Sequence, residues 1–173
     1  CLAQAGALVG ELLEQGYEQF LGVPPHLSVA QWFADPQYHD ARPGLSFLSG
    51  VERIQAMFAN GDMAVVGGFG VNDTAPLTTP LLHKAIPQLF ELLLKSDVQV
   101  ALNSSSWRYA YRFEALQKKL VDSNIARVFQ GHRGSLIWVQ SLVIRKNPRT
   151  ERLLLDATDW QNSYDQGICG GAE

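Results

Sequence analysis

The sequence predicts one α/β (or α+β) domain preceded by a helical extension, and three observations support this class. The chain has 173 residues, of which 46% are hydrophobic and 18% are charged, a composition typical of a globular protein with a real core. Apolar residues recur at helical spacing over residues 2–60, whereas short apolar runs alternate with amphipathic stretches from residue 63 onward. Helices between strands predict a sheet with helices packed on it.

The first 60 residues predict three helices. Apolar residues at helical spacing predict a helix over residues 2–21, which Gly22 ends. Ser28 predicts the cap of a short helix that ends before Pro36, followed by a loop over residues 36–48. Ser49 predicts the cap of a third helix, with an apolar stripe that comprises Val51, Ile54, Met57 and Phe58.

The next segment predicts a strand, a helix and a second strand. The run 63–69 is suited to a buried strand, and the glycines at its end indicate a close backbone approach or a sharp turn. Thr79 and Pro80 predict the start of a helix over 80–95 that Pro87 should kink or divide. Alternating apolar residues predict a strand over 98–102.

The last part predicts a helix, a strand and a hairpin. Residues 104–106 predict a capping loop for a helix over 107–121, and residues 125–129 predict a short strand. Residues 135–145 and 151–158 alternate around 146–150, which indicates a β-hairpin. The predicted division is therefore a helical extension over 1–61, an α/β domain over 62–160 and a flexible tail over 161–173.

Charge is unevenly distributed along the chain. The net charge is −3, so the whole chain is not a polycation built for nucleic acid. Residues 108–152 nevertheless hold ten basic and three acidic residues, a balance of +7, which leaves −10 for the remainder. This asymmetry favours either a surface offered to an anionic partner or ordinary solvated helix and hairpin surfaces. Apolar runs such as 92–94 are far shorter than the ~20 residues of a membrane-spanning helix.

The first residue suggests where in the cell the protein is located. A mature bacterial lipoprotein begins with a lipid-carrying cysteine, and Cys1 is followed by small, mostly uncharged residues suited to a tether. Three alternatives stay open: Cys1 as an N-terminal nucleophile, a disulfide between Cys1 and Cys169, and an arbitrary boundary of the chain.

The order of predicted elements from residue 63 resembles a family of bacterial envelope lipoproteins. These are the curli-secretion and flagellar lipoproteins and the activator of penicillin-binding proteins, whose domain is similar to the N-terminal domain of TolB. The resemblance covers a strand and polar loop at 64–73, a helix at 80–95, a strand at 98–102, a helix at 112–121 and strands at 125–130, 136–145 and 152–156. The hairpin turn at 147–150 lacks the usual Thr-Gly, and residues 2–60 have no counterpart. The resemblance implies an assembly or activation partner rather than an enzyme.

Two other function classes start from local sequence features. The glycine-rich stretch Gly67–Asp73 could cradle a phosphate or hold a metal, although it has neither G-x-G-x-x-G nor a Walker ending. This stretch supports, as an alternative, a small phosphate- or nucleotide-binding enzyme domain. Aromatic and basic residues mix at Trp107–Arg112, which suits stacking on nucleic acid or a protein interface.

The sequence carries no readable catalytic signature. His39 beside Asp40 is the one histidine next to a carboxylate, and its spacing from His26 fits no standard zinc pattern. Ser104–Ser106 lacks the glycines of a nucleophile elbow. No catalytic residue, metal ligand or cofactor is predicted.

The prediction from sequence is therefore a non-enzymatic, periplasmic, membrane-anchored lipoprotein of a bacterial envelope or secretion assembly. Cys1 is its predicted lipid attachment site. The predicted partner-binding residues are basic or aromatic, and the partner is another envelope protein or an anionic envelope polymer. The predicted partner-binding residues are Arg108, Tyr109, Arg112, Arg145 and Arg149. A nucleic-acid-binding module that uses the basic face of residues 108–152 is a further alternative.

Overall fold

The computed structural model describes residues 1–40, 42, 44–69, 79–102, 111–117, 123–135 and 137–146. Its strands are β1 (Leu2–Gln4), β2 (Val51–Phe58), β3 (Met63–Val66) and β4 (Ile137–Ile144). Its α-helices are α1 (Val9–Glu14), α2 (Val29–Ala34), α3 (Pro80–Leu93), α4 (Ser96–Leu102) and α5 (Ile125–Val128). Short 3-10 helices lie at Glu18–Phe20, Pro36–Tyr38, Ser46–Ser49 and Phe113–Leu116.

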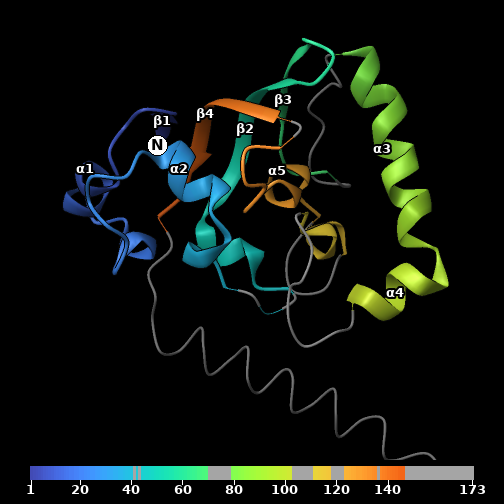
Figure 1. The fold of residues 1–173 in the computed structure, drawn as a ribbon, viewed down its shortest axis with the longest axis horizontal. Coiled ribbons are helices and arrows are strands. Elements are labelled where there is room, and N and C mark those ends of the chain that lie inside the picture. The colour runs from blue at the N-terminus through green and yellow to red at the C-terminus, as the bar shows by residue number, and fades with distance from the viewer. Residues whose placement is uncertain are drawn as a thin grey trace, which may run out of the picture.

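The four strands form one antiparallel sheet in the order β1-β4-β2-β3 (Figure 1). The mixed α/β class predicted from sequence is confirmed. β4 lies inside the sheet, between the first strand of the chain and β2. The beginning of the chain and a strand more than 130 residues later are therefore direct neighbours, since Leu2 pairs with Val143.

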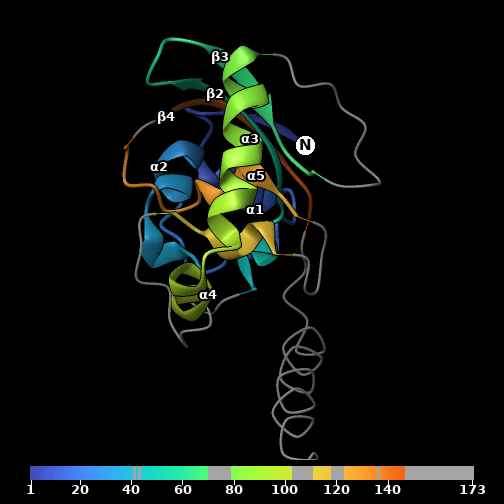
Figure 2. The same ribbon diagram turned by 90° about the vertical axis from the view of Figure 1, so that its right-hand side faces the viewer.

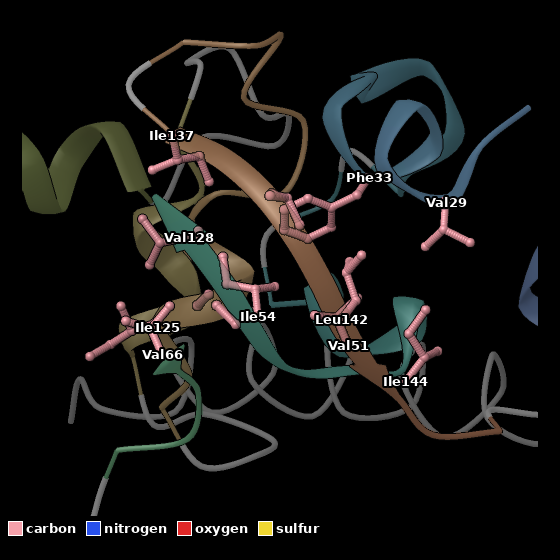
Figure 3. Close-up of a cluster of buried hydrophobic side chains, with 14 of the residues drawn as sticks. Val29, Phe33, Val51, Ile54, Val66, Ile125, Val128, Ile137, Leu142 and Ile144 are labelled. Atoms are coloured by element: carbon pink, nitrogen blue, oxygen red, sulfur yellow. The ribbon is translucent and has the colours of Figure 1, made fainter. Parts of the chain in front are cut away.

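The core lies between one face of this sheet and helices α2 and α5 (Figure 3). Buried side chains alternate along β4, where Ile137, Val139, Leu142 and Ile144 point to this side. Helix α2 contributes a fully buried Phe33. Each buried aliphatic or aromatic side chain of this kind stabilises the fold by roughly 1.5–3 kcal/mol.

Helices also lie at both edges of the sheet. Helices α1 and α2 lie beside the β1–β4 end, and α3 runs past the β3 end (Figures 1 and 2). Thr79 caps α3, because its hydroxyl accepts a hydrogen bond from the N–H of Leu82 at 3.3 Å. Among the described residues, no helix combines the length and apolar character needed to span a bilayer.

Several predicted elements are confirmed. Ser28 caps α2 in a reciprocal capping box with Gln31, with N–H to oxygen distances of 3.2 and 3.0 Å. β3, α3 and β4 also lie where the sequence predicts them. Helix α3 continues through Pro87, so this residue does not divide the helix, and the alternative of a kink stays a prediction.

The predicted helix over residues 49–59 is wrong, because this segment is the central strand β2. Irregular pairing with β4 between Val51 and Arg53 shifts the side-chain alternation, so buried Val51 and Ile54 are three residues apart. Three-residue spacing mimics a helical stripe. Ser49 caps no helix; its hydroxyl accepts a hydrogen bond from the N–H of Val51 at 3.2 Å.

Three further predictions of secondary structure are corrected. The segment 2–21 forms β1, α1 and a 3-10 helix rather than one helix, and it turns with positive φ at Gly16. The predicted strand over 98–102 belongs to α4, which has Asp97 in its first turn. The predicted strand over 125–129 is α5, because the side chain of Asn124 caps it.

The predicted boundary after residue 61 does not separate two units. It falls in the turn between β2 and β3, which pair with each other, and β1 and β2 belong to the same sheet as β4. The predicted hairpin partner over 151–158 and the tail lie outside the described residues. β1 already occupies the position beside residues 141–143 of β4.

Candidate functional site

The face of the sheet that points away from the core presents three rows of side chains. Residues paired across antiparallel strands share a face, so the pairing register of the four strands shows which side chains form each row. We call this surface the outer face; its rows are Met63–Met57–Trp138, Val65–Gln55–Ser141–Gln4 and Arg53–Val143–Leu2.

Large apolar side chains of the outer face are accessible to solvent. Leu2 is 65% exposed, Trp138 59%, Val65 51%, and Met57 and Met63 40% each. Together they present on the order of 500 Å² of apolar surface. Met63, Met57, Trp138 and Val65 are neighbours in this set, whereas Leu2 is separated from them by the polar side chains of Gln55, Ser141 and Gln4. Clustered apolar side chains on a monomer are often functional, whereas scattered ones are ordinary.

The strands hold the outer face in a fixed arrangement. Met57 is paired with Met63 on one side and with Trp138 on the other, so the first row crosses three strands. Gly67 continues β3, and a Cβ atom here would meet the carbonyl oxygen of Glu52 at 2.9 Å. Glycine therefore permits the close backbone approach that the sequence predicted at this point.

The chemistry of the outer face is that of a contact surface. Trp and Met are enriched in the cores of protein interfaces, whereas Lys, Glu and Asp are depleted. Arg53 is the one charged residue in the three rows. These side chains include no general base and no nucleophile except the hydroxyl of Ser141, which is buried.

An open groove of about 730 Å³ lies beside α2, away from the outer face. Its lining combines apolar, polar and charged residues, namely Leu27, Gln31, Ala34, Asp35, Pro36, Gln37, Tyr38 and Arg133. The carboxylate of Asp35 already accepts hydrogen bonds from the backbone and side chain of Gln37, at 3.0 and 2.8 Å. This lining holds no nucleophile paired with a base.

Arg133 reaches the groove from a strained turn. Its φ of 55° lies in the left-handed region, which is unusual for a residue other than glycine. Its N–H donates to the carbonyl of Ala34 at 2.8 Å, and the N–H of Gly131 donates to Phe33 at 2.7 Å. These bonds join the turn to the C-terminal end of α2, so the strain has a structural explanation.

Arg112, a predicted partner-binding residue, is fully buried, so its assignment to a partner surface is wrong. Its guanidinium pairs with Glu114 and donates to the carbonyl oxygens of Asp40 and Arg42, at 2.7 and 3.0 Å. The side chain therefore connects two irregular segments of the chain. A charge count along the sequence cannot detect this burial.

The other described cations of residues 108–152 are not assembled into one free basic face. Arg127 is buried and donates to the carbonyl of Val51 at 2.8 Å, and desolvation lowers its pKa to about 10. Arg145, another predicted partner residue, is exposed and pairs with Glu52 at 3.3 Å. Lys146 lies 5.4 Å from the ring centre of Tyr17.

The remaining predicted sites fall largely outside the described residues. These include Arg108, Tyr109 and Arg149, together with Asp73 and Ser104–Ser106. The described beginning of the glycine-rich stretch has a structural role: Phe69 donates to Ser123, and Ile125 donates to Gly67, both at 2.8 Å.

His39 is buried beneath α2. Its Nε2 lies 3.2 Å from the carbonyl oxygen of Phe33, and its ring lies edge-on to Trp32 with 4.9 Å between centres. Burial lowers the pKa of His39 to about 4. Within the described part of the chain, no group of three or more metal-ligating side chains is present.

Cys1 has an exposed thiol. Its backbone nitrogen lies 2.6 Å from the carbonyl oxygen of Ile144 and 3.0 Å from the hydroxyl oxygen of Tyr17. Because Leu2–Gln4 forms β1, the predicted tether over the first residues is wrong. Cys169 lies outside the described residues, so the disulfide stays a prediction.

No protein-family model, curated protein or solved structure matches this chain. The resemblance to envelope lipoproteins expects strands at 98–102 and 125–130. These two segments instead contain helices α4 and α5. β3, α3 and β4 agree with the secondary structure expected for their segments, and the resemblance itself stays a prediction.

The outer face is hidden in the sequence because the apolar residues of 51–58 have helical spacing. As a strand, this segment places Met57 between Met63 and Trp138. The available signal was the polar turn at 60–62 between two runs of strand-forming residues, which is typical of a hairpin.

Replacing Arg112 with Met is expected to lower the free energy of unfolding by about 3–5 kcal/mol, because Glu114 would remain buried without its partner. Urea denaturation followed by circular dichroism measures this change. The control Arg133→Met alters an exposed side chain and should stay within about 0.5 kcal/mol of the wild type. Equal effects of the two substitutions would contradict the assigned role of Arg112.

Stability should fall in acid partly through His39. Its pKa is lower in the folded state than the unfolded value of 6.5, so its contribution is complete above pH 6.5 and is lost as the pH falls toward 4. The loss is about 3 kcal/mol. Urea denaturation at a series of pH values should show a shallower decline for His39→Gln than for the wild type, whereas exposed His26→Gln should match the wild type. Parallel declines for all three proteins would refute this assignment.

Proposed function

We propose that this chain is a non-enzymatic interaction component that contacts a protein partner through its outer face. The observation that carries this proposal is the row Met63–Met57–Trp138, in which three large, exposed apolar side chains lie side by side on three strands. A pre-formed row of this kind binds without a large ordering cost, because the backbone is already fixed by the sheet.

The character of the three rows supports a protein partner. Trp138 is a rigid amphipathic side chain of the type that dominates interface energetics, and Met57 and Met63 adapt to the shape of a neighbour. The single charge on this surface gives a nucleic acid little to bind, since phosphate contacts require several cations.

The proposal also places this contact in a bacterial envelope assembly, with a lipid on Cys1 as the anchor. The exposed thiol of Cys1 supports the anchor. Because β1 begins at Leu2, such a lipid would hold a membrane close to the β1 edge of the sheet, rather than at the end of a flexible linker.

Substitution of the outer face should abolish partner capture. Three immobilised proteins would be incubated with extract of the source cells. They are the wild type, an outer-face variant that combines Met57→Gln with Trp138→Gln, and a control variant that combines Leu94→Gln with Val100→Gln. The control residues are exposed and apolar but lie after α3 and on α4. Quantitative mass spectrometry should show at least about tenfold less partner on the outer-face variant alone. Undiminished capture by that variant would refute the proposal.

The anchor at Cys1 has its own test. In cells that express the natural gene, the protein should occur in the membrane fraction, and Cys1→Ser should move it to the soluble fraction. Mass spectrometry of the peptide that contains Cys1 would identify the lipid. An unmodified thiol, or residues preceding Cys1 in the natural protein, would end the anchor prediction while leaving the outer-face proposal intact.

A further inference from the structure

We infer that the partner of the outer face is a second copy of this chain, which packs sheet against sheet about a two-fold axis. This inference rests on the proposed function and adds the identity of the partner. In a two-fold dimer the same surface meets itself, so that surface must be complementary to its own copy. Three properties of the outer face meet this requirement.

The first property is the absence of charged side chains at the centre of the outer face. The row Met63–Met57–Trp138 is neutral, and so is the middle row that contains Val65 and Gln55. Arg53 lies in the third row, away from the first. Two copies can therefore approach without placing like charges opposite each other at the centre, which would disfavour the dimer.

The second property is the chemistry of the middle row. Gln4 and Gln55 flank Ser141, and each glutamine amide both donates and accepts hydrogen bonds. An amide is therefore complementary to another amide of the same kind. Gln55 Oε1 already accepts a hydrogen bond from the Ser141 hydroxyl at 3.4 Å. Buried against lipid tails, the amide of Gln4 and the amide N–H groups of Gln55 would lose water and gain no partner. With Arg53 as its one cation, the outer face also lacks the basic cluster that anionic membranes attract.

The third property is size. Four strands about 4.8 Å apart and three rows about 7 Å apart give a flat footprint about 20 Å on each side. Projecting side chains raise this to roughly 700 Å² of accessible surface per copy, within the range of a standard protein interface. A dimer centred on β2 would cover Met57, Met63, Val65 and Trp138, whereas Leu2 on the edge strand β1 would lie at its rim.

The geometry of packed sheets fixes how the copies would meet. Two twisted antiparallel sheets pack about 10 Å apart, with their strands inclined by about 30°. Met57 lies between Met63 and Trp138. A two-fold axis that runs along β2 near Met57 would therefore place the Trp138 indole of one copy on the Met63 thioether of the other. Sulfur–aromatic contacts of this kind are favourable.

Sedimentation equilibrium of the full chain tests self-association. It is measured over a wide concentration range with a reducing agent, because a disulfide through Cys1 would also give dimers. The wild type should show a reversible monomer–dimer equilibrium. Trp138→Gln and Met57→Gln should each raise the dissociation constant at least about tenfold, whereas the control Val100→Gln should leave it unchanged. Circular dichroism confirms that each variant is folded. A wild type that is monomeric throughout overturns the inference.

Photo-crosslinking from position 65 separates the inference from the proposed function. A benzophenone amino acid replaces Val65 in the full chain, in cells that contain the natural partners. A product of two chains, lost when Trp138→Gln is also present, supports the dimer. A product with a different protein overturns the dimer and leaves the proposed function standing. Crosslinking to lipid alone, or no crosslink at all, overturns both.

Discussion

The pairing of β4 with strands on both of its sides is the constraint on which the rest of the structure depends. Its register with β1 and β2 brings residues from the start, the middle and the later part of the chain into one sheet. One side of β4 then supplies Val139, Leu142 and Ile144 to the core, and the other side supplies Trp138 to the outer face. Core and contact surface are thus two sides of the same hydrogen-bonded ladder.

Buried arginine side chains hold parts of the chain together in addition to the strand pairing. The guanidinium of Arg112 binds the carbonyls of Asp40 and Arg42, and Arg127 binds the carbonyl of Val51. Buried carbonyl groups need hydrogen-bond donors, and where no strand provides them an arginine can satisfy several at once. This explains why part of the basic segment is buried instead of presented to a partner.

Local signals in the sequence predicted a substantial part of the fold. Ser28 and Thr79 are side-chain caps, so α2 and α3 could be located from sequence, and the alternation of β4 is regular at its ends. β2 could not be located in this way, because its irregular pairing is determined by β4, which lies about 80 residues away. The same long-range pairing assembles the outer face, so the candidate site was as hidden from the sequence as the strand that carries it.

The shortness of β1 has a mechanical consequence. It is held to β4 over Leu2–Gln4, with further bonds from Ile144 to Cys1 and from Ala5 to Gln140. Tension applied through Cys1 would load these few bonds before it reached the long β2–β4 ladder. β1 would therefore be the first strand to peel away, so the sheet would yield at its edge while its centre stayed intact.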